Sequence, residues 1–253
     1  LPHFQEIKDD KKRIALEYSL PKWLVNHWVT HHGLEKTEEI AQSLLAPVKS
    51  TVRANISRGS VDDIVTKLEN EGFNVEKDDI LPFCLHVSGQ TIVNSRAFKD
   101  GYVSIQDKSS MMVAHIMKLG RDDKVLDACS APGGKACHMA EILSPEGQVD
   151  ATDIHLHKID LIQHNIKKLK LDNIHAFQHD ATEPYKEMYD KILVDAPCSG
   201  LGVLRHKPEI KYTQTQDSIQ SLVDLQLQIL ENIKHNIKSG GTITYSTCTI
   251  EQM

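Results

Sequence analysis

Two cysteines follow apolar, strand-like runs at distant places in the chain. Cys198 lies in DAPCSG (residues 195–200), and Cys248 lies in YSTCT (residues 245–249). Because C5 of a pyrimidine is a poor nucleophile, its methylation needs a thiolate that adds to C6 and a base that later removes the C5 proton. One thiol can add to the ring and the other can assist release. The pair therefore predicts methyl transfer to a pyrimidine ring.

A glycine-rich turn upstream is typical of a nucleotide-like cofactor site. The run VLDACSAPGGK (residues 125–135) reads as a strand, a turn and the start of a helix. Gly133 and Gly134 let the backbone approach a ligand, and the N-terminus of the helix offers N–H groups to an anion. The spacing matches neither the dinucleotide motif nor the phosphate-binding P-loop. We expect S-adenosylmethionine, whose methionine carboxylate would be the anion.

Acidic residues end the strands that surround this turn. Asp153 follows the turn by roughly 20 residues, where a carboxylate can accept hydrogen bonds from both ribose hydroxyls. Asp180 ends the next strand and can meet the adenine amino group, whereas Asp195 can hydrogen-bond the N3 and N4 edge of the target base. A single strand-end aspartate is often only a turn or helix cap. Asp127, Asp153 and Asp180, at successive strand ends beside the glycine turn, together favour a nucleoside-binding edge, however.

A parallel sheet is needed to bring these residues together. From about Gly101 onward, strand-like and helix-like segments alternate, which indicates an α/β fold with helices on both faces of the sheet. In a sheet ordered 3-2-1-4-5, the fourth and fifth strands are neighbours, so Cys198 and Cys248 would flank one pocket. The expected strands are 124–128, 148–153, 173–178, 190–195 and 241–246, with helices near 135–143, 156–170 and 217–238.

Two smaller parts precede this sheet. Residues 11–45 read as helices, with a start signal at Pro21 and a stop signal at Gly33. Residues 46–100 read as a small α+β module, with strands at 51–56 and 83–87 and a helix that is capped by Ser60 and ends at Gly72. The expected domains are a helical part at 1–45, the small module at 46–100 and the large domain at 101–253.

Composition limits the partners of the chain. Its 253 residues are 40% hydrophobic and carry a formal net charge of −6, which argues against a uniformly basic nucleic-acid binder, so any RNA contact must be local. No apolar run approaches the roughly 18 to 20 residues of a membrane span, so we expect a soluble, cytoplasmic protein without a membrane partner. We also expect a monomer. The candidate basic groups are Arg53 with Arg58, Lys167 and Lys168 with Lys170, and Arg205, His206 and Lys207 with Lys211. Taken alone, each of these groups is more typical of a solvated face than of an RNA contact.

The cysteines and histidines do not predict a metal site. The five cysteines include no C-x-x-C pair, which argues against a four-thiolate zinc site and against a disulfide framework. His175 and His179 fall on an expected strand, where a spacing of four residues lacks the helical geometry of a zinc pair. We therefore expect no metal and reduced thiols.

Taken together, the motifs resemble those of a known family. DACSAPGGK (127–135), DAPCSG (195–200) and YSTC (245–248) resemble the RNA cytosine-C5 methyltransferases of the NOL1/NOP2/Sun family. GYVSIQD (101–107), LGVLR (201–205) and PKWL (21–24) further resemble its bacterial Sun/Fmu (RsmB) type, which modifies a cytidine of 16S ribosomal RNA. The resemblance spans essentially the whole chain.

The resemblance implies a Rossmann-like class I methyltransferase sheet, preceded by an RRM-like module and N-terminal helices, with 16S rRNA as partner. By the same resemblance, Cys248 is the nucleophile, Cys198 assists release of the product, and Lys158 matches a basic position. The family also carries an RNA-binding domain before this region and further strands after it, so we expect a chain truncated at both ends. The cofactor residues implied are Cys129, Ser130, Ala131, Pro132, Gly133, Gly134, Lys135, Asp153, Asp180 and Asp195.

Three alternatives remain open from the sequence. The same chemistry on tRNA or another RNA would use the same catalytic motifs, because RNA choice depends on surfaces outside the base pocket. A non-catalytic RNA-binding or ribosome-assembly factor would not need both thiols. An N-methyltransferase would show an Asn/Asp-Pro-Pro-aromatic loop at residues 195–198, where this chain has DAPC.

Overall fold

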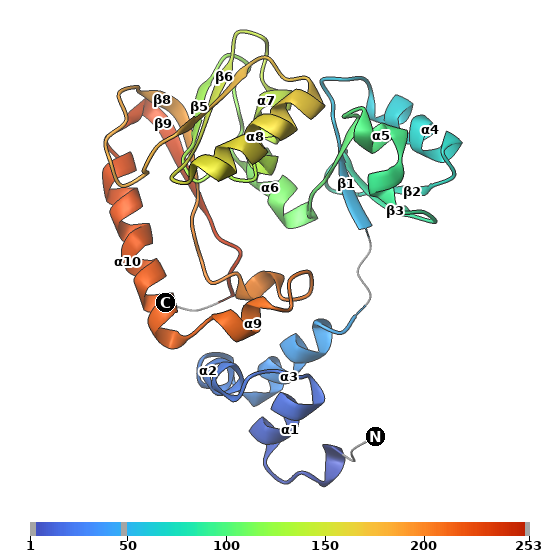
Figure 1. Cartoon of the computed structure of the whole chain (residues 1–253), viewed down its shortest axis with the longest axis vertical. Helices are drawn as coiled ribbons and strands as arrows, with labels where there is room; N and C mark the ends of the chain where they lie inside the picture. Colours follow the sequence, from blue (N-terminus) through green and yellow to red (C-terminus); the bar gives the residue numbers. More distant parts are fainter. Residues whose placement is uncertain (1–3, 47–49, 251–253) are drawn as a thin grey trace. The chain divides into compact units, whose positions relative to one another are not determined.

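The computed structural model describes residues 4–46 and 50–250, and the chain forms two compact units (Figure 1). Within the described residues, unit 1 contains 4–46, 197–224 and 247–250, and unit 2 contains 50–196 and 225–246. The units therefore cut across the domains expected from the sequence. Residues 1–3 and 251–253, at the ends where truncation is expected, lie outside the described part of the chain.

Unit 2 is built on a parallel sheet with the strand order β7-β6-β5-β8-β9, which confirms the predicted order 3-2-1-4-5. Because β5 is central, Asp127 at its carboxyl end pairs with Ala151 on one side and Leu193 on the other. The five strands are β5 (Lys124–Asp127), β6 (Gln148–Asp153), β7 (Ile174–Gln178), β8 (Tyr189–Asp195) and β9 (Ile237–Ser246).

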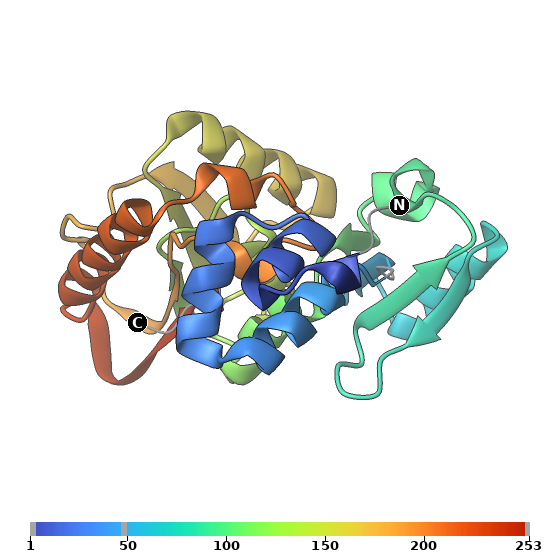
Figure 2. The same cartoon turned by 90° about the horizontal axis from the view of Figure 1, so that it is seen from below.

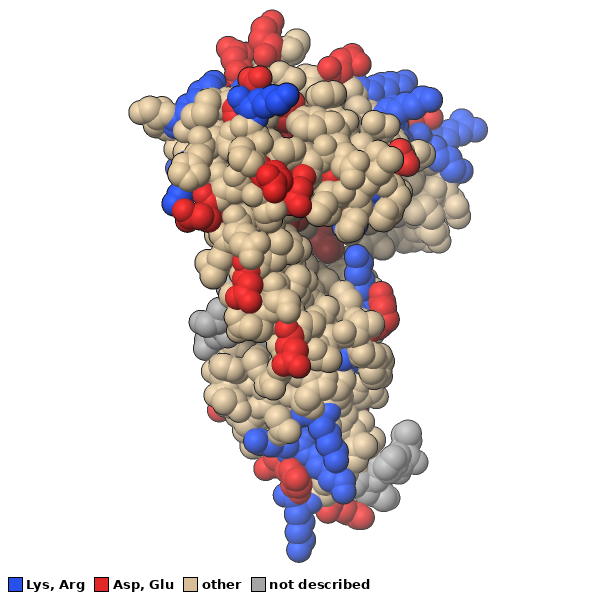
Figure 3. Space-filling view, turned by 60° about the vertical axis from the view of Figure 1, so that its left-hand side comes forward, with Lys and Arg blue, Asp and Glu red and all other residues tan. Residues whose placement is uncertain are grey.

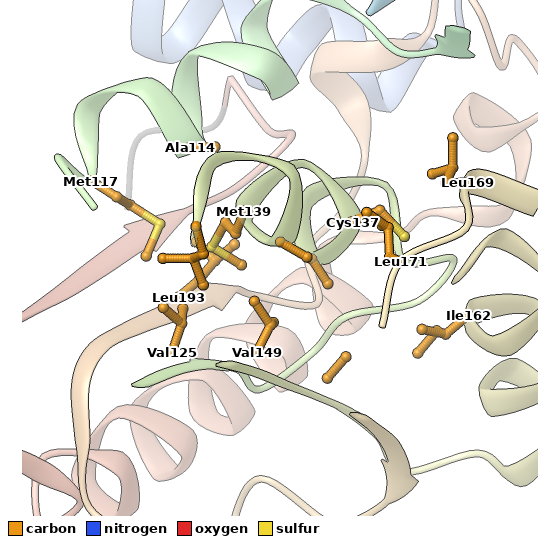
Figure 4. Packing of buried hydrophobic residues seen from close by; sticks show 14 of the residues in the cluster. Ala114, Met117, Val125, Cys137, Met139, Val149, Ile162, Leu169, Leu171 and Leu193 are labelled. Carbon is orange, nitrogen blue, oxygen red and sulfur yellow. The ribbon is translucent and has the colours of Figure 1, made fainter. Parts of the chain in front are cut away.

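Apolar side chains alternate between the two faces of this sheet, so each face needs its own cover. Val125 and Leu193 pack in the cluster under α6, α7 and α8, which Figure 4 shows from close by. Leu126 and Ile192 face the other way, and the second half of α10 covers them. Figure 1 shows α7 and α8 on one side of the sheet and α10 on the other. The helices are α6 (Lys108–Ile116), α7 (Gly134–Ile142), α8 (Leu156–Leu169) and α10 (Gln216–Ile233).

A smaller antiparallel sheet, also in unit 2, has the strand order β2-β3-β1-β4. As predicted, Ser60 caps the N-terminus of α4, where its hydroxyl accepts a hydrogen bond from the N–H of Asp63 at 3.1 Å. Residue 104 in β4 pairs with residue 53 in β1, so this sheet extends past the expected boundary at residue 100. The elements are β1 (Ser50–Ala54), β2 (Asn74–Lys77), β3 (Cys84–Ser88), β4 (Val103–Ile105), α4 (Val61–Asn70), η2 (Ile92–Asn94) and α5 (Arg96–Lys99).

The two sheets of unit 2 are joined by a fully buried ion pair. Arg53 in β1 donates from Nε and Nη2 to the two carboxylate oxygens of Glu141 in α7, at 2.9 and 2.6 Å. Its Nη1 also donates to the carbonyl oxygen of Gly134 at 2.8 Å and to the side chain of Gln106. Both charged side chains are 0% exposed. The prediction that Arg53 contacts RNA is therefore wrong, because its strand turns the side chain toward α7 instead of toward solvent.

Five elements of unit 2, namely β2, β4, η2, α5 and α6, are not predicted by the sequence pattern, and β9 is longer than predicted. β2 is a polar, mostly exposed edge strand and β4 has three residues, so neither carries enough apolar residues to signal a strand. Helix α6 is likewise unforeseen. β9 begins at Ile237, before the predicted 241, and Gly240 adopts a φ of 79° in the segment where the register with β8 shifts.

Unit 1 is a helical body whose core joins residues far apart in the sequence. The starts and stops predicted at Pro21 and Gly33 bound the second helix. Trp28 is fully buried with Leu201 and Leu204, which follow the DAPCSG motif. The first three α-helices lie side by side, as Figure 2 shows in blue. The elements are η1 (Phe4–Glu6), α1 (Asp10–Glu17), α2 (Lys22–His32), α3 (Leu34–Ser43), η3 (Leu201–Val203) and α9 (Ile210–Thr213), with the first half of α10.

Within the described part of the chain, no helix combines the length and the apolar character that a membrane span requires.

We predict that Arg53→Met lowers the free energy of unfolding by about 3–5 kcal/mol, because it leaves the Glu141 carboxylate buried without its partner. Burial already raises the pKa of that carboxyl, and Arg53 opposes the rise. The double variant Arg53→Met/Glu141→Leu is expected to recover most of the loss, since apolar side chains tolerate burial without a partner. Urea unfolding followed by circular dichroism measures both differences.

A matched control is Arg121→Met, which removes the same charge from an exposed position and is expected to stay within about 0.5 kcal/mol of the parent protein. Equal destabilisation by the single and the double variant would contradict the prediction.

Candidate active site

The loop between β5 and α7 is held by its neighbours on both sides. The N–H of Ser130 donates to the carbonyl oxygen of Thr152 in β6 at 2.8 Å, and the N–H of Gly133 closes a turn onto the Ser130 carbonyl oxygen at 2.7 Å. Gly133 adopts a φ of 97°, and a Cβ there would lie 3.0 Å from the side chain of Ile162 in α8. Glycine is thus required at this position for its backbone conformation and for the close approach of α8.

Two supporting side chains were not foreseen from the sequence. The hydroxyl of Thr152 lies 3.1 Å from the carbonyl oxygen of Ala128 and 2.9 Å from the hydroxyl of Tyr185. Asn165 in α8 donates from Nδ2 to the carbonyl oxygen of Pro132 at 2.8 Å. Their sequence neighbourhoods carry no signal for this role, because the contacts join segments that only the packing of β6 and α8 brings to the loop.

Asp127 is fully buried at the end of β5, and neither carboxylate oxygen accepts a well-formed hydrogen bond from the described residues. Burial, followed by the nearby charge of Asp195, raises the pKa of Asp127 to about 7, while the charge of Lys135 opposes the shift. The Ser130 hydroxyl is also buried without a hydrogen-bond partner. Buried acceptors of this kind suit a ligand ammonium group. The sequence analysis counted Asp127 among the acids of the nucleoside-binding edge but assigned it no particular ligand group.

The next two predicted acids lie at the ends of β6 and β7. Asp153 is buried, and its Oδ1 accepts from the N–H of His155 at 3.0 Å and lies 3.6 Å from Nζ of Lys158. Oδ1 of Asp180 accepts from both the N–H and the hydroxyl of Thr182, at 2.9 and 2.7 Å, and these bonds lower the pKa of Asp180. In each carboxylate one oxygen thus shapes the local turn. The other oxygen has no hydrogen-bond partner among the described residues.

Asp195 at the end of β8 is held from two directions. Its Oδ2 accepts from Nζ of Lys135 at 2.6 Å, and its Oδ1 accepts from the hydroxyl of Ser246 in β9 at 2.6 Å. The sequence analysis had assigned Lys135 to the cofactor. Lys135, the second residue of α7, thus ties the start of that helix to the end of β8.

Unit 1 brings the two predicted thiols together. Sγ of Cys198 lies 3.1 Å from Sγ of Cys248, and the N–H of Cys248 donates to Sγ of Cys198 at 3.2 Å. The hydroxyls of Ser199 and Thr249 share a hydrogen bond of 2.7 Å beside them. The N–H of Gly202 donates to the carbonyl oxygen of Cys248 at 2.9 Å, where a Cβ on the glycine would lie equally close to that oxygen.

The remaining three cysteines are unsuited to nucleophilic chemistry. Burial raises the pKa of Cys84 to about 11 and the pKa values of Cys129 and Cys137 to about 12. In contrast, Cys198 is half-buried and Cys248 is exposed. Since the thiolate is the reactive form, accessibility and packing single out the pair in unit 1.

One group of potential metal ligands comes together among the residues that the structure describes. Asp78, Cys84 and His86 place their donor atoms within 4.8 Å of one another, although the sequence analysis did not single them out. The ammonium group of Lys108 lies 2.7 Å from Oδ2 of Asp78, which also lies 3.2 Å from Nε2 of His86. The carboxylate of this group is therefore already paired with a cation of the protein itself, the Lys108 ammonium group. His175 lies 3.9 Å from the Asp150 carboxylate, outside this group.

The residues of the loop fit S-adenosylmethionine. The unpartnered carboxylate of Asp127 suits its ammonium group, the first N–H groups of α7 suit its carboxylate, and Asp153 suits its ribose. A Cβ on Gly134 would meet no atom within 4 Å, so the start of the helix faces open space. Sheet order, loop and acids together define a Rossmann-like S-adenosylmethionine-dependent methyltransferase fold.

Sequence comparison identifies the family to which the chain belongs within this class. Residues 114–253 match the family model described as 16S rRNA methyltransferase RsmB/F, and residues 20–94 match the ferredoxin-like domain of RsmF/B-like methyltransferases. The chain belongs to the RsmB/F family of rRNA methyltransferases, which confirms the resemblance inferred from its motifs.

Relatives and solved structures agree with this assignment. The chain is 42% identical to a Bacillus subtilis protein named probable ribosomal RNA small subunit methyltransferase B, over 100% of this chain and 57% of that protein. It is 32% identical to ribosomal RNA small subunit methyltransferase B of Proteus mirabilis, over 92% of this chain and 56% of that protein. The chain thus spans a little over half the length of these curated relatives.

Among solved structures, a methyltransferase homologue from Pyrococcus horikoshii is similar with a TM-score of 0.84 and 26% identity, over 97% of this chain and 79% of that chain. NSun6 from the same organism, solved with SFG, has a TM-score of 0.84 at 22% identity, over 91% of this chain and 84% of that chain, and supports the fold.

We predict that the ligand-free protein becomes less stable as pH rises through 7. The folded-state pKa of Asp127, about 7, lies above its ordinary value, so the neutral carboxyl group stabilises the folded state fully below about pH 4. This stabilisation, on the order of 4 kcal/mol, is lost by pH 8. Asp127→Asn is expected to remove this loss. Urea unfolding of both proteins between pH 4 and 8 measures the difference.

Cofactor affinity is expected to change in the opposite direction, because a ligand ammonium group pairs with the ionised carboxylate. Calorimetry should show that the parent protein binds S-adenosylmethionine more tightly as pH rises from 6 to 8. Asp127→Asn should bind it weakly and without that pH dependence. Parallel pH profiles for the two proteins would refute the assignment.

Proposed function

We propose that this chain transfers a methyl group from S-adenosylmethionine to C5 of a cytidine in 16S rRNA, through a covalent bond between Cys248 and C6 of the base. The observation that carries the proposal is the 3.1 Å approach of the Cys198 and Cys248 sulfur atoms. Two accessible thiols are what C5 chemistry requires, whereas N-methylation and RNA binding alone require neither.

In the proposed first step, the Cys248 thiolate adds to C6 and makes C5 nucleophilic. Bound S-adenosylmethionine supplies the electrophilic methyl group at this point. Cys198, as a thiolate, then takes the proton from C5, and the electron pair left behind re-forms the C5–C6 double bond and expels the Cys248 thiolate. Atoms balance without a further reactant, since one proton leaves C5 for each methyl group gained.

Asp195 is proposed to hold the N3 and N4 edge of the base. Lys135 and Ser246 each donate a hydrogen bond to one of its oxygens and so fix the carboxylate in place. An acceptor there binds the N4 amino group and a protonated N3, and so stabilises the positive charge that favours addition at C6.

Each predicted thiol follows a strand of unit 2 closely in the sequence. Cys198 follows Asp195 by three residues, and Cys248 follows Ser246 by two. An extended backbone spans at most about 11 Å over three residues and about 7 Å over two. Each thiol is therefore tethered to the end of its strand, β8 or β9.

The choice of 16S rRNA rests on the relatives. The matching family model and the two curated proteins carry small-subunit rRNA names. The target nucleotide must leave its stack before Cys248 can reach C6.

The test is a trapping experiment with a 16S rRNA fragment that contains 5-fluorocytidine. Fluorine at C5 replaces the proton that must leave, so the covalent complex persists and migrates as a slow band on a denaturing gel. We expect the adduct with the parent protein and with Cys198→Ala, but none with Cys248→Ala. With ordinary cytidine, Cys198→Ala should slow turnover by about 100-fold or more.

Cys84→Ala is the matched control, because it removes a buried thiol whose pKa is raised to about 11, and its adduct should equal that of the parent protein. A tRNA containing the same analogue tests the alternative substrate. An adduct that survives Cys248→Ala would refute the assigned nucleophile.

A further inference from the structure

Two basic segments that lie far apart in the sequence meet at one tyrosine in unit 2. The Arg58 guanidinium and the Lys67 ammonium group each lie 4.8 Å from the centre of the Tyr102 ring. The positive charge of Lys170, at the end of α8, also acts on the Tyr102 hydroxyl. Arg58, Lys67 and Lys170 together lower the pKa of Tyr102. Beside them, Nζ of Lys168 lies 3.9 Å from the centre of the Phe98 ring.

Close backbone contacts hold this surface together. Asn55 donates from Nδ2 to the carbonyl oxygens of Gly101 and Leu169, at 3.0 and 3.2 Å. Any Cβ on Gly101 would overlap the carbonyl oxygen of Lys168. The small sheet and α8 are thus in contact through backbone atoms, which fixes the spacing of the cations that each contributes.

None of these four cations forms an ion pair with a carboxylate in the described part of the chain, although many other lysines and arginines do. Lys67 and Lys170 are exposed, and Arg58 is half-buried. Although the chain carries a net charge of −6, these cations form a local positive group to which an anion can bind. The face in Figure 3, by comparison, shows basic side chains in small groups with acidic ones spread between them.

We propose that this surface, formed by Arg58, Lys67, Lys168 and Lys170 around Tyr102 and Phe98, binds the phosphate backbone of the substrate RNA outside the target nucleotide. The proposal rests on the proposed function, because it takes the substrate to be RNA. Cations that flank aromatic rings suit a backbone whose bases can stack nearby, whereas an acidic peptide offers no base.

The position of the surface sets its role. α8 has 14 residues and runs from the cofactor end of β6 to Lys170, so the surface lies about 20 Å from the carboxyl edge of the sheet. Contact there can strengthen binding of a long RNA but cannot touch the reacting base. Its loss should therefore raise KM for RNA and leave kcat unchanged.

The experiment compares Lys67→Gln/Lys170→Gln with Lys36→Gln/Lys234→Gln, which removes the same charge from two lysines that are paired with Glu39 and Glu231. Binding of a 16S rRNA fragment is measured between 50 and 200 mM salt. The first variant should bind about tenfold more weakly, with an unchanged melting temperature. The slope of the logarithm of its binding constant against the logarithm of the salt concentration should be smaller in magnitude by about 2. The control should retain the parent slope, and a short RNA around the target should bind both variants alike.

Equal slopes for the parent protein and Lys67→Gln/Lys170→Gln would overturn the proposal. Polyglutamate that displaces the RNA from the parent but not from this variant would also overturn it, in favour of an acidic protein partner. The fluorocytidine adduct separates the two proposals: an adduct with unchanged slopes leaves the methyl-transfer function standing without this surface. A reduced slope without an adduct leaves the surface standing without the function.

Discussion

The buried pair of Arg53 and Glu141 is the interaction on which the arrangement of unit 2 depends. It joins the small antiparallel sheet to α7, the helix that begins at the glycine turn, and the same guanidinium also binds the carbonyl oxygen of Gly134. Two charges without exposure to solvent stabilise a fold only while both partners are in place. The small sheet is therefore part of the structure that shapes the loop, and α7 cannot shift without breaking this pair.

The chemistry is divided between the units. The loop, Asp127 and Asp195 belong to the rigid parallel sheet, whereas Cys198 and Cys248 belong to the helical body and share its hydrogen bonds. A residue held by a sheet is positioned by many backbone bonds, while the thiols are positioned by neighbouring loops and by Gly202. This division gives each half of the proposed reaction its own support.

Electrostatics in this chain is local. Its net charge is −6, yet burial raises the pKa of Asp127 and Lys135 pairs with Asp195. The cations around Tyr102 have no carboxylate partner among the described residues. The overall composition argued against a uniformly basic surface, and it could not locate these local groups. Charge in a folded protein acts over about a Debye length, so position outweighs the total.

The sequence by itself determined the strand segments, the glycine turn, the strand-end acids, the two candidate cysteines and the family, because these depend on local periodicity and on short motifs. Only the tertiary structure decided which cations face solvent. Arg53 and Arg58 are five residues apart and read alike, yet one is buried against Glu141 and the other lies over Tyr102. Strands β2 and β4, the role of Thr152 and the unpartnered state of Asp127 likewise arise from contacts between distant segments, which no local pattern encodes.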